Sequence, residues 1–384
     1  MNVLHVIPSI AEESSGPTYY MLRMGNSLAD AGVKVELHTL LPLPRLSMQL
    51  QFQVKGYPRY DLFNMGFSPE MRRGLAKAAS SMDIIHNNSL WMMPNLYPYK
   101  VARRSGCKIV TSPHGTLSAW ALSRGRWKKR VFGALFQYPA LRHTDMWHAT
   151  CEKEYEEIRN MGFRQPVAIV PIGMDVPEFL VSGSEFLVPG SVTENQMKKV
   201  VFFGRLHKVK GVDRLVRAWE EVAREGWELL IAGPDCGMLE ELKGIVAERK
   251  LPRVSFVGEI NGHAKYEFLA SADIYVLPSD TENFGVTVAE ALASGTPAIV
   301  SQGTPWHGIE REGCGRWVPI GVEPLTAALK ELMAMSDDER AAMGARGREW
   351  MTRDFSWKSI GAKMKSSYEW LLGHGEKQEW IRED

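Results

Sequence analysis

The chain has 384 residues, which is long for one core and suits two domains that each bury an interior. Apolar residues make up 45% and charged residues 24%, a composition typical of water-soluble α/β proteins, and no stretch approaches the roughly 20 apolar residues of a membrane span. The four scattered cysteines form no CxxC pair, which disfavours a zinc site or a disulfide framework, so we expect a cytoplasmic protein.

The first elements predict a parallel sheet. Residues 2–8 form an apolar run that lacks the basic flank of a signal peptide, and a loop with Gly16 follows. A helical pattern over residues 18–30 ends before Gly32, and residues 33–40 resume as a strand. A strand, loop, helix and strand in this order are typical of doubly wound α/β domains. Further apolar runs that continue the sheet lie at residues 84–85, 108–111, 146–149 and 167–170.

Two residues after predicted strands of this first half are candidates for ligand contact. Gly16 has no Cβ, so a ligand could approach its backbone. His114, in the sequence SPHG, directly follows the strand at residues 108–111 and could hydrogen-bond a sugar hydroxyl or share a proton. Ligands of open parallel sheets bind at the carboxyl ends of the strands, which favours function over a purely structural role for His114.

A basic amphipathic segment is predicted at residues 123–130. Residues 1–175 hold 21 Lys and Arg against 13 Asp and Glu, whereas the remainder holds 25 against 32. The excess concentrates between Arg124 and Arg130, beside a helical stripe of Trp127, Val131, Leu135 and Tyr138. Two interpretations stay open: contact with an anionic membrane surface, or a solvated helix whose stripe packs on the domain. No aromatic-interleaved basic motif recurs, so nucleic acid is not an expected partner.

A second doubly wound unit follows a region rich in Gly, Ser, Pro and Glu. Its predicted strands begin at residue 198, and no G-x-G-x-x-G fingerprint follows the first strand of the chain, which disfavours a nicotinamide enzyme. Arg205 and Lys210 lie after the strand that ends at Phe203. Two fixed positive charges at a strand end could neutralise a diphosphate and stabilise it as a leaving group.

The only charged residue between Asn283 and Ile309 is Glu290, which lies in a predicted helix that is apolar or small on every side. A carboxylate there is costly unless a partner or ligand hydrogen-bonds it. Glu282 precedes it by eight residues, across a short loop that leads into the helix N-terminus. Helix N-termini attract phosphates, and carboxylates bind sugar hydroxyls. The pattern therefore predicts a site for a phosphorylated sugar.

Several short segments, spread over nearly the whole chain, carry a resemblance to a known family. They are the Gly16-Pro17 loop, SPHG at 112–115, FFGRLHKVKG at 202–211, IAGPD at 231–235 and ENFGVTVAE at 282–290. With these segments the chain resembles the family 4 retaining glycosyltransferases of the GT-B fold. The resemblance implies two Rossmann-like domains facing each other across a cleft. It places the N-terminal domain at 1–175, a linker at 176–196, the nucleotide-sugar domain at 197–355, and a helix crossing back at 356–384.

The resemblance also implies roles for individual residues. Arg205 and Lys210 would hold the donor diphosphate, Glu282 the transferred sugar and Glu290 the ribose. His114 would lie at the reaction centre. The remaining contacts implied for the donor are Gly16, Gly233, Val257 and the backbone amides of Asn283, Phe284 and Gly285. Asn87 and Trp91, in HNNSLW, resemble an acceptor-side loop.

The expected reaction is metal-independent transfer of a hexose, with retention, from a nucleotide-diphosphate sugar, with no cofactor. Relatives with GTPW, here at 303–306, imply a glycan or lipid-diphosphate-linked acceptor in surface polysaccharide synthesis, peripheral on the inner membrane. A sugar phosphorylase or sugar-phosphate synthase would share these features and stays an alternative. A non-catalytic sugar-nucleotide-binding subunit is disfavoured, because Arg205, Lys210 and Glu282 are all present.

Overall fold

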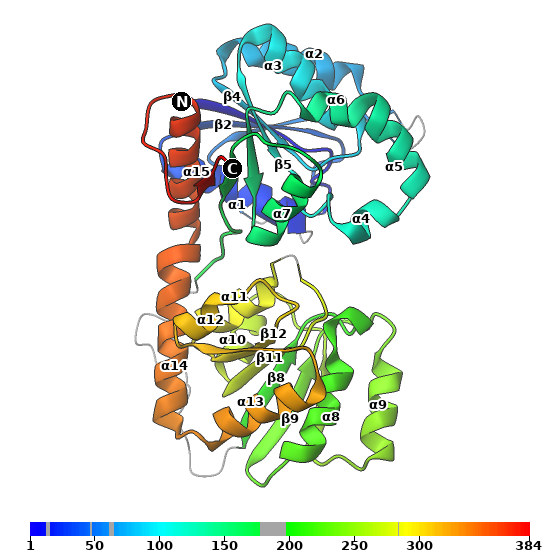
Figure 1. Cartoon of the computed structure of the whole chain (residues 1–384), viewed down its shortest axis with the longest axis vertical. Helices are drawn as coiled ribbons and strands as arrows, with labels where there is room; N and C mark the ends of the chain where they lie inside the picture. The colour runs from blue at the N-terminus through cyan, green and yellow to red at the C-terminus, as the bar shows by residue number, and fades with distance from the viewer. Residues whose placement is uncertain (13–15, 47, 61–64, 177–196, 283) are drawn as a thin grey trace. The chain divides into compact units, whose positions relative to one another are not determined.

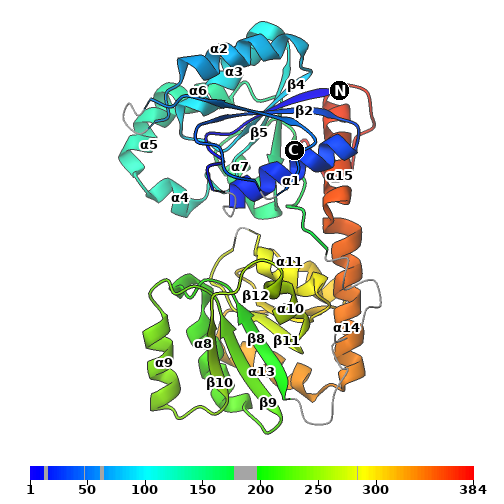
Figure 2. The ribbon, with the colours of Figure 1, turned by 180° about the vertical axis from the view of Figure 1, so that it is seen from behind.

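The computed structural model describes residues 1–12, 16–46, 48–60, 65–176, 197–282 and 284–384. It divides into two compact units (Figures 1 and 2). Unit 1 contains Met1–Gly173 and Trp357–Asp384, and unit 2 contains Met174–Ser356. Most of the predicted linker, at residues 177–196, lies outside the described residues. In the part of the chain described, no helix is both long and apolar enough to cross a membrane.

Unit 1 is built on one sheet, as the alternation of strand and helix patterns predicts. The order of its strands is β14-β7-β6-β5-β4-β1-β2-β3, and all neighbours are parallel except the final pair, β14 with β7. The chain winds first from β1 to β3 and then returns to β4 on the other side of β1. The strands are β1 (Asn2–Val6), β2 (Lys34–Leu40), β3 (Gln53–Tyr57), β4 (Ile84–Asn88), β5 (Lys108–Ser112), β6 (Met146–Ala149), β7 (Val167–Ile169) and β14 (Ile381–Arg382).

Helices cover both faces of this sheet because successive strand residues point to opposite sides. Val3 packs into a core with α1 and α15, whereas its neighbour Leu4 packs into a second core with α2, α3, α6 and α7. Figures 1 and 2 show α1 and α15 together on one side and α2 and α3 on the other. The helical elements are α1 (Gly16–Asp30), α2 (Pro69–Ala78), η2 (Ala79–Ser81), η3 (Met93–Asn95), α3 (Tyr97–Ser105), α4 (Ala119–Ser123), α5 (Arg126–Phe132), the π-helical turn η4 (Gly133–Gln137), α6 (Tyr138–Leu141), α7 (Glu152–Asn160) and α15 (Trp357–Leu371).

The last helix, α15, completes the first of these cores although it is far away in sequence. A Cβ on Gly361 would lie 2.0 Å from Ser27 Oγ in α1, so the two helices can approach this closely only with glycine there. The same hydroxyl donates to the carbonyl of Trp357. Farther along the helix, Tyr368 is fully buried and its hydroxyl lies 2.6 Å from His86 Nδ1. Unit 1 therefore buries residues from both ends of the chain.

The basic segment does not pack its apolar stripe on the domain, and that interpretation is wrong. Trp127, Val131 and Leu135 are 70%, 48% and 64% exposed, and Phe136 beside them is 53% exposed. Of the predicted stripe only Tyr138 is partly buried, with its ring against Gly133 and Trp91. The helix also changes type within the stripe, at η4, where the hydrogen-bond spacing widens. An apolar stripe is thus left facing outwards among the basic residues.

Unit 2 repeats the doubly wound arrangement with a sheet in the order β10-β9-β8-β11-β12-β13, parallel throughout. Its strands are β8 (Lys198–Phe203), β9 (Trp227–Ala232), β10 (Val254–Gly258), β11 (Ile274–Leu277), β12 (Ala298–Ser301) and β13 (Gly315–Val318). Its helical elements are η6 (Lys208–Lys210), α8 (Val212–Val222), α9 (Leu239–Glu248), α10 (Ala264–Ala270), α11 (Val286–Ala293), α12 (Gly308–Arg311), α13 (Val322–Ala334), α14 (Asp337–Trp350) and the π-helical turn η7 (Met351–Phe355).

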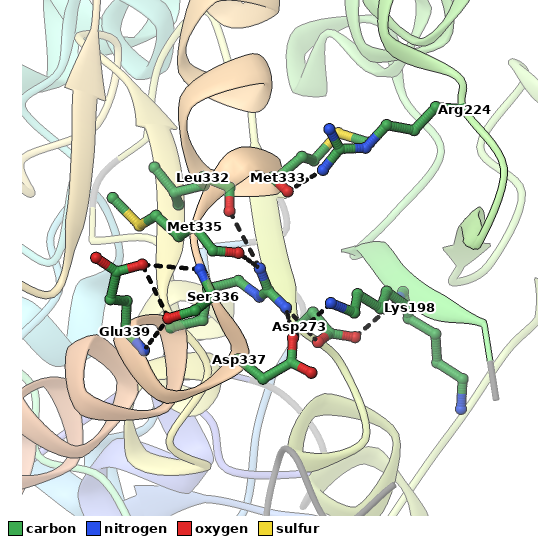
Figure 3. Close-up of polar contacts among 11 residues, drawn as sticks. Lys198, Arg224, Asp273, Leu332, Met333, Met335, Ser336, Asp337 and Glu339 are labelled. Carbon is green, nitrogen blue, oxygen red and sulfur yellow. Dashed lines mark hydrogen bonds and ion pairs between the residues drawn. The ribbon is translucent and has the colours of Figure 1, made fainter. Parts of the chain in front are cut away.

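A polar cluster fixes the start of α14 against the sheet of unit 2 (Figure 3). Ser336 and Glu339 form a reciprocal capping box, with Ser336 N donating to Glu339 Oε2 at 2.8 Å and Glu339 N to Ser336 Oγ at 3.3 Å. The guanidinium of Arg340 is 3% exposed and meets two carboxylates, Asp337 and, at 3.5 Å, Asp273. Asp273, the residue directly before β11, also accepts a hydrogen bond from the backbone amide of Lys199 at 2.8 Å.

Replacing Arg340 with Met should destabilise the protein by about 3 kcal/mol, because two partly buried carboxylates lose their shared cation. The loss of stability should be at the low end of the range for a buried ion pair, because Asp337 retains a second ion pair with Lys198 at 2.5 Å. Urea unfolding measures it, with Arg346→Met as the matched control on the exposed side of the same helix. Equal midpoints for the two variants would contradict the assignment.

Candidate active site

The two predicted basic residues and Glu282 lie at the switch point of the unit 2 sheet. The chain leaves β8 toward β9 and returns to β11 on the other side of β8, so the loops after β8 and β11 diverge there. Lys210, from η6 after β8, places Nζ 2.5 Å from Glu282 Oε1, after β11. The two side chains are 15% and 11% exposed, and Ser279 Oγ donates to the same carboxylate oxygen at 2.6 Å. A lysine and a carboxylate thus meet near the surface at a sheet edge suited to ligands.

Glu290 is buried in α11 as its sequence context predicts, but it does not lack an internal partner. Lys265 Nζ, from α10, contacts Glu290 Oε1, and the lysine is 26% exposed. Burial raises the pKa of Glu290 above its ordinary value, and the charge of Lys265 opposes that rise. Of the two ways expected to compensate this carboxylate, a partner or a ligand, the structure supplies the partner, Lys265. The pair still reaches the surface through Lys265, so a ribose hydroxyl could share the carboxylate.

Three further predicted residues lie at or near the carboxyl ends of β8, β9 and the edge strand β10. Gly233 follows β9 with a φ of +139°, and a Cβ there would lie 1.9 Å from the carbonyl oxygen of Gly204, so only glycine fits. Arg205 is exposed after β8, with no ion pair among the described residues. Val257 is 46% exposed near the end of β10, where the pairing with β9 is interrupted by a bulge. All three follow or end strands at the carboxyl side of the sheet, and their contact with a ligand stays a prediction.

The N-terminus of α11 begins at a left-handed glycine. Gly285 has a φ of +78° and precedes Val286, the first residue of the helix. Phe284 is buried, with its ring 5.1 Å from that of Trp306, whose Nε1 donates to the Phe284 carbonyl at 2.5 Å. Trp306 is the last residue of the GTPW segment, and these two contacts hold the loop before α11 in place. Asn283, the third backbone donor expected here, lies outside the described residues.

In unit 1 the loop after β5 holds His114 in a left-handed conformation. Its φ is +51°, which is uncommon for a residue with a Cβ, and Gly115 follows at +74°. Two buried side chains fix this loop. Glu154, from α7, accepts from the amide of Gly115 at 2.6 Å, and Asn88 Oδ1 lies 3.1 Å from His114 Nε2. Strained backbone held in place by buried polar groups is a frequent property of functional loops.

The hydrogen bonds of Asn88 determine which nitrogen of His114 carries the proton. Asn88 Nδ2 lies within 3.0 and 3.4 Å of the carbonyl oxygens of His86 and Val6, so it must be the donor and Oδ1 the acceptor. His114 Nε2 must therefore carry a proton. Burial lowers the pKa of His114 to about 3, so its ring is neutral and Nδ1 has a free lone pair. His114 is thus set to accept a hydrogen bond at Nδ1.

A second chain of buried groups is ordered in the same way. His148 Nε2 donates to the carbonyl of Val170 at 2.8 Å, so His148 Nδ1 accepts from Ser112 Oγ at 2.6 Å. Ser112 then accepts from His86 Nε2, and His86 Nδ1 accepts from Tyr368, each at 2.6 Å. Burial lowers the pKa of His148 to about 4. This chain connects α15 with the strand ends beside the His114 loop.

Nitrogen-15 NMR of the histidine rings should show His114 protonated at Nε2 and unprotonated at Nδ1 at pH 7. The neutral form should persist at pH 6, where an exposed histidine would be mostly charged, because the pKa of His114 is lowered to about 3. His143, which is exposed in the same unit, is the internal reference. An Nδ1-protonated signal for His114 would contradict the hydrogen-bond assignment of Asn88.

The other predicted residues of unit 1 differ in their surroundings. Gly16 is the exposed first residue of α1, and among the described residues, its chain neighbours aside, no atom lies within 4 Å of a Cβ placed on it, so their packing does not require glycine there. Trp91 has a φ of +76° and donates from Nε1 to the Thr116 carbonyl at 3.0 Å. Asn87 is fully buried, with its amide bonded to Tyr99 and Asn95. In this structure Asn87 thus contacts its neighbours and not solvent, and direct acceptor contact by Asn87 stays a prediction.

Known proteins resemble both units. A model of the glycosyl transferase 4-like domain matches residues 15–173, and the model of glycosyl transferases group 1 matches residues 186–350. The chain belongs to the group 1 glycosyltransferases. This is a family of retaining hexosyltransferases with the GT-B fold, which use nucleotide sugars as donors.

Individual relatives are more distant. A GDP-mannose-dependent monoacylated alpha-(1-6)-phosphatidylinositol monomannoside mannosyltransferase of Corynebacterium glutamicum is 28% identical over 68% of this chain and 70% of its own. A phosphatidyl-myo-inositol mannosyltransferase of Mycobacterium tuberculosis is 29% identical over 54% of this chain, which spans about half, 55%, of that relative. Anabaena Alr3699/HepE, solved with UDP-glucose, has a TM-score of 0.66 at 16% identity, over 96% of this chain and 99% of its own.

Four residues that support the site of this glycosyltransferase are not evident from the sequence. Lys265 and Ser279 bind the two glutamates, and Asn88 and Glu154 hold the His114 loop. Lys265, Asn88 and Glu154 each come from an element other than the one they support, so sequence spacing does not connect them, whereas Ser279 lies three residues before Glu282 in the same loop. One signal was available for Glu154, a carboxylate in the first turn of a helix that directly follows a buried strand.

Proposed function

We propose that this glycosyltransferase moves a hexose from a nucleotide-diphosphate sugar to a glycan or lipid-diphosphate-linked glycan acceptor during surface polysaccharide synthesis. The observation that carries the donor part is the Lys210–Glu282 pair at the switch point of the unit 2 sheet. The acceptor part draws on the exposed apolar stripe among basic residues in unit 1. Two relatives named for mannosyl transfer to phosphatidylinositol-type lipids are in accord with a lipid-linked acceptor.

In this proposal, Lys210 and Arg205 stabilise the diphosphate as it leaves. Lys210 has three N–H donors and gives one to Glu282, so two remain for phosphate oxygens. Arg205 is exposed and adds a second fixed charge. The backbone amides at the start of α11 would contribute the positive end of the helix dipole. These groups supply the charge stabilisation that a divalent cation would otherwise give, so the reaction should proceed in the presence of a chelator.

The two glutamates have separate tasks. Glu282 Oε1 is already occupied by Lys210 and Ser279, which leaves Oε2 for hydroxyls of the transferred sugar. Glu290, which is buried in α11, would bind the ribose. The ribose hydroxyls would then compete with Lys265 for the Glu290 carboxylate. Neither carboxylate is proposed as a nucleophile, because each is engaged by a lysine. His114 would accept a hydrogen bond from a sugar hydroxyl at Nδ1, near the reaction centre.

Thermal-shift screening against nucleotides and nucleotide sugars tests this proposal. A ligand at one hundred times its dissociation constant should stabilise the protein by about 2.7 kcal/mol. Among nucleotides that differ only in their base, we expect one to stabilise the protein much more than the others. Glu290→Gln should reduce that shift, because it removes a charged hydrogen-bond acceptor for the ribose. Glu310→Gln, on the exposed side of α12, is the matched control. Stabilisation by a sugar 1-phosphate but by no nucleotide sugar would indicate a phosphorylase instead.

A further inference from the structure

A groove between α2 and α3 in unit 1 gathers positive charge without matching negative charge. Its volume is about 1000 Å³. The cationic side chains that line it are Arg72, Arg73, Lys100, Arg103 and Arg104. Within the described part of the chain, only Arg73 of these five has an ion-pair partner, Glu70 at 3.2 Å. Like charges that line one groove repel one another, so an anion in the α2–α3 groove would relieve that repulsion.

An apolar cavity of about 360 Å³ adjoins this groove, between α3 and η4. The two share Arg72, Tyr97, Lys100 and Arg103, so the charged groups form the rim of the cavity. The larger apolar side chains that line it include Phe67, Met93, Leu96, Leu135, Phe136 and Pro139. Its volume is that of a small ligand or of part of a long acyl or prenyl chain. We call it the η4 cavity.

The outer wall of the η4 cavity belongs to the exposed apolar stripe. Leu135 and Phe136 line the cavity and are 64% and 53% exposed, and Trp127, two turns earlier, is 70% exposed. Large apolar side chains among cations are typical of protein surfaces that lie at a membrane interface. A nucleic acid would use the charge but not the apolar cavity. A free phosphate would likewise leave the cavity without an occupant.

We propose that the α2–α3 groove and the η4 cavity together bind one anionic membrane lipid. Its phosphate would lie on Arg72, Lys100 and Arg103, and its apolar chain would enter the cavity between Phe67 and Phe136. This site would hold unit 1 on the membrane independently of the basic residues of α5. The inference rests on the proposed function and deepens it, because it names a lipid site for an enzyme proposed to use a lipid-linked acceptor.

The charged half of the site is tested by vesicle flotation at 0.15 M salt, with phosphatidylcholine vesicles that contain or lack phosphatidylglycerol. Replacing Arg72, Lys100 and Arg103 together with Gln should weaken binding to the anionic vesicles roughly a hundredfold, given the usual contribution of a cation at such a surface. The matched control replaces three exposed cations elsewhere in unit 1, Lys34, Arg164 and Lys358, with Gln. Equal loss in both triple variants would overturn the proposal, as would no loss in the groove variant.

The apolar half is tested by replacing Leu135 and Phe136 with Ser, which their exposure should permit without unfolding. Binding to anionic vesicles should fall at least tenfold at 0.15 M salt and recover in part at low salt, where charge attraction is less screened. Unchanged binding would exclude the η4 cavity as a chain site. Inorganic phosphate or a single-stranded RNA that occupies the groove of the wild type as tightly as the vesicles would also overturn the lipid assignment.

Failure of this inference is distinguishable from failure of the proposed function. The nucleotide-sugar site proposed in unit 2 does not include any of the substituted residues, so the groove variant should keep the wild-type thermal shift with the donor nucleotide. A groove variant that loses vesicles but keeps this shift supports both proposals. Normal vesicle binding by a protein that no nucleotide sugar stabilises would leave the lipid site standing and remove the donor proposal.

Discussion

Lys210→Met should lower turnover of the donor by roughly a hundredfold to a thousandfold, the usual effect of removing one preorganised charge from a developing anion. The loss should be in kcat more than in KM, because the charge on the leaving diphosphate grows toward the transition state. The rate of turnover is measured as nucleoside diphosphate released from the donor, with either water or a supplied acceptor receiving the sugar. Substitution also leaves Glu282 without its cation, so part of the effect would come from a displaced sugar contact.

Two further variants separate these contributions. Lys208→Met removes an exposed lysine from the same turn, two residues earlier, and should change kcat by less than threefold. In the double variant Lys210→Met with Glu282→Gln, the two losses should not add, because the residues share one hydrogen bond. Simple additivity of the two losses, or a Lys208 variant as slow as the Lys210 variant, would contradict the assigned role.

The sequence predicts most strands of both units because each of these is an apolar run bounded by loops and helices, but it does not predict β3 or β13. It also does not predict β14, which has two residues and pairs antiparallel with β7. Nothing in so short a segment distinguishes it from a loop, and only the distant α15 brings it to the sheet. The helical sequence pattern also runs without interruption from α14 through η7 into α15. It therefore does not show that the helix breaks at Ser356.

For the site, the sequence identifies residues at strand ends but not the side chains that hold them. Glu290 is placed correctly in a buried helix, whereas Lys265, its partner, is 25 residues earlier in another helix. The same holds for His114, which depends on Asn88 and Glu154 from β4 and α7. Such contacts arise from tertiary packing, and a single sequence carries no periodic signal for them. For the basic segment, only tertiary packing could decide whether its stripe faces outwards.

Unit 1 should lose stability steeply below pH 6.5. Burial lowers the pKa of His5 and His114 to about 3 and that of His148 to about 4, against an ordinary value near 6.5. In the unfolded chain these rings bind protons from about pH 6.5 downwards, whereas in the folded unit they stay neutral until about pH 4. Their stabilising contribution is therefore complete above pH 6.5 and is lost as the pH falls toward 4.

Between pH 6.5 and 4, each of the three rings should reduce the free energy of unfolding by about 1.4 kcal/mol per pH unit. At pH 5 the combined loss from these three rings reaches about 6 kcal/mol, comparable with the whole stability of many domains. Glu154 acts in the opposite direction, because burial raises its pKa and its protonation then favours the folded state. One such group offsets only part of the effect of three histidines, so the net change should still be a loss.

Hydrogen exchange at pH 7.5 and 5 distinguishes the two units, because it reports β5 and β8 separately. Protection of β5 should fall far more than that of β8, since the three histidines of unit 2, His207, His263 and His307, are exposed. His5→Leu removes one of five unit 1 histidines whose pKa burial lowers, the others being His38, His86, His114 and His148, and should reduce the slope of unfolding free energy against pH by about one fifth. Equal pH dependence of the two strands would mean that the buried imidazoles of unit 1 take up protons without unfolding.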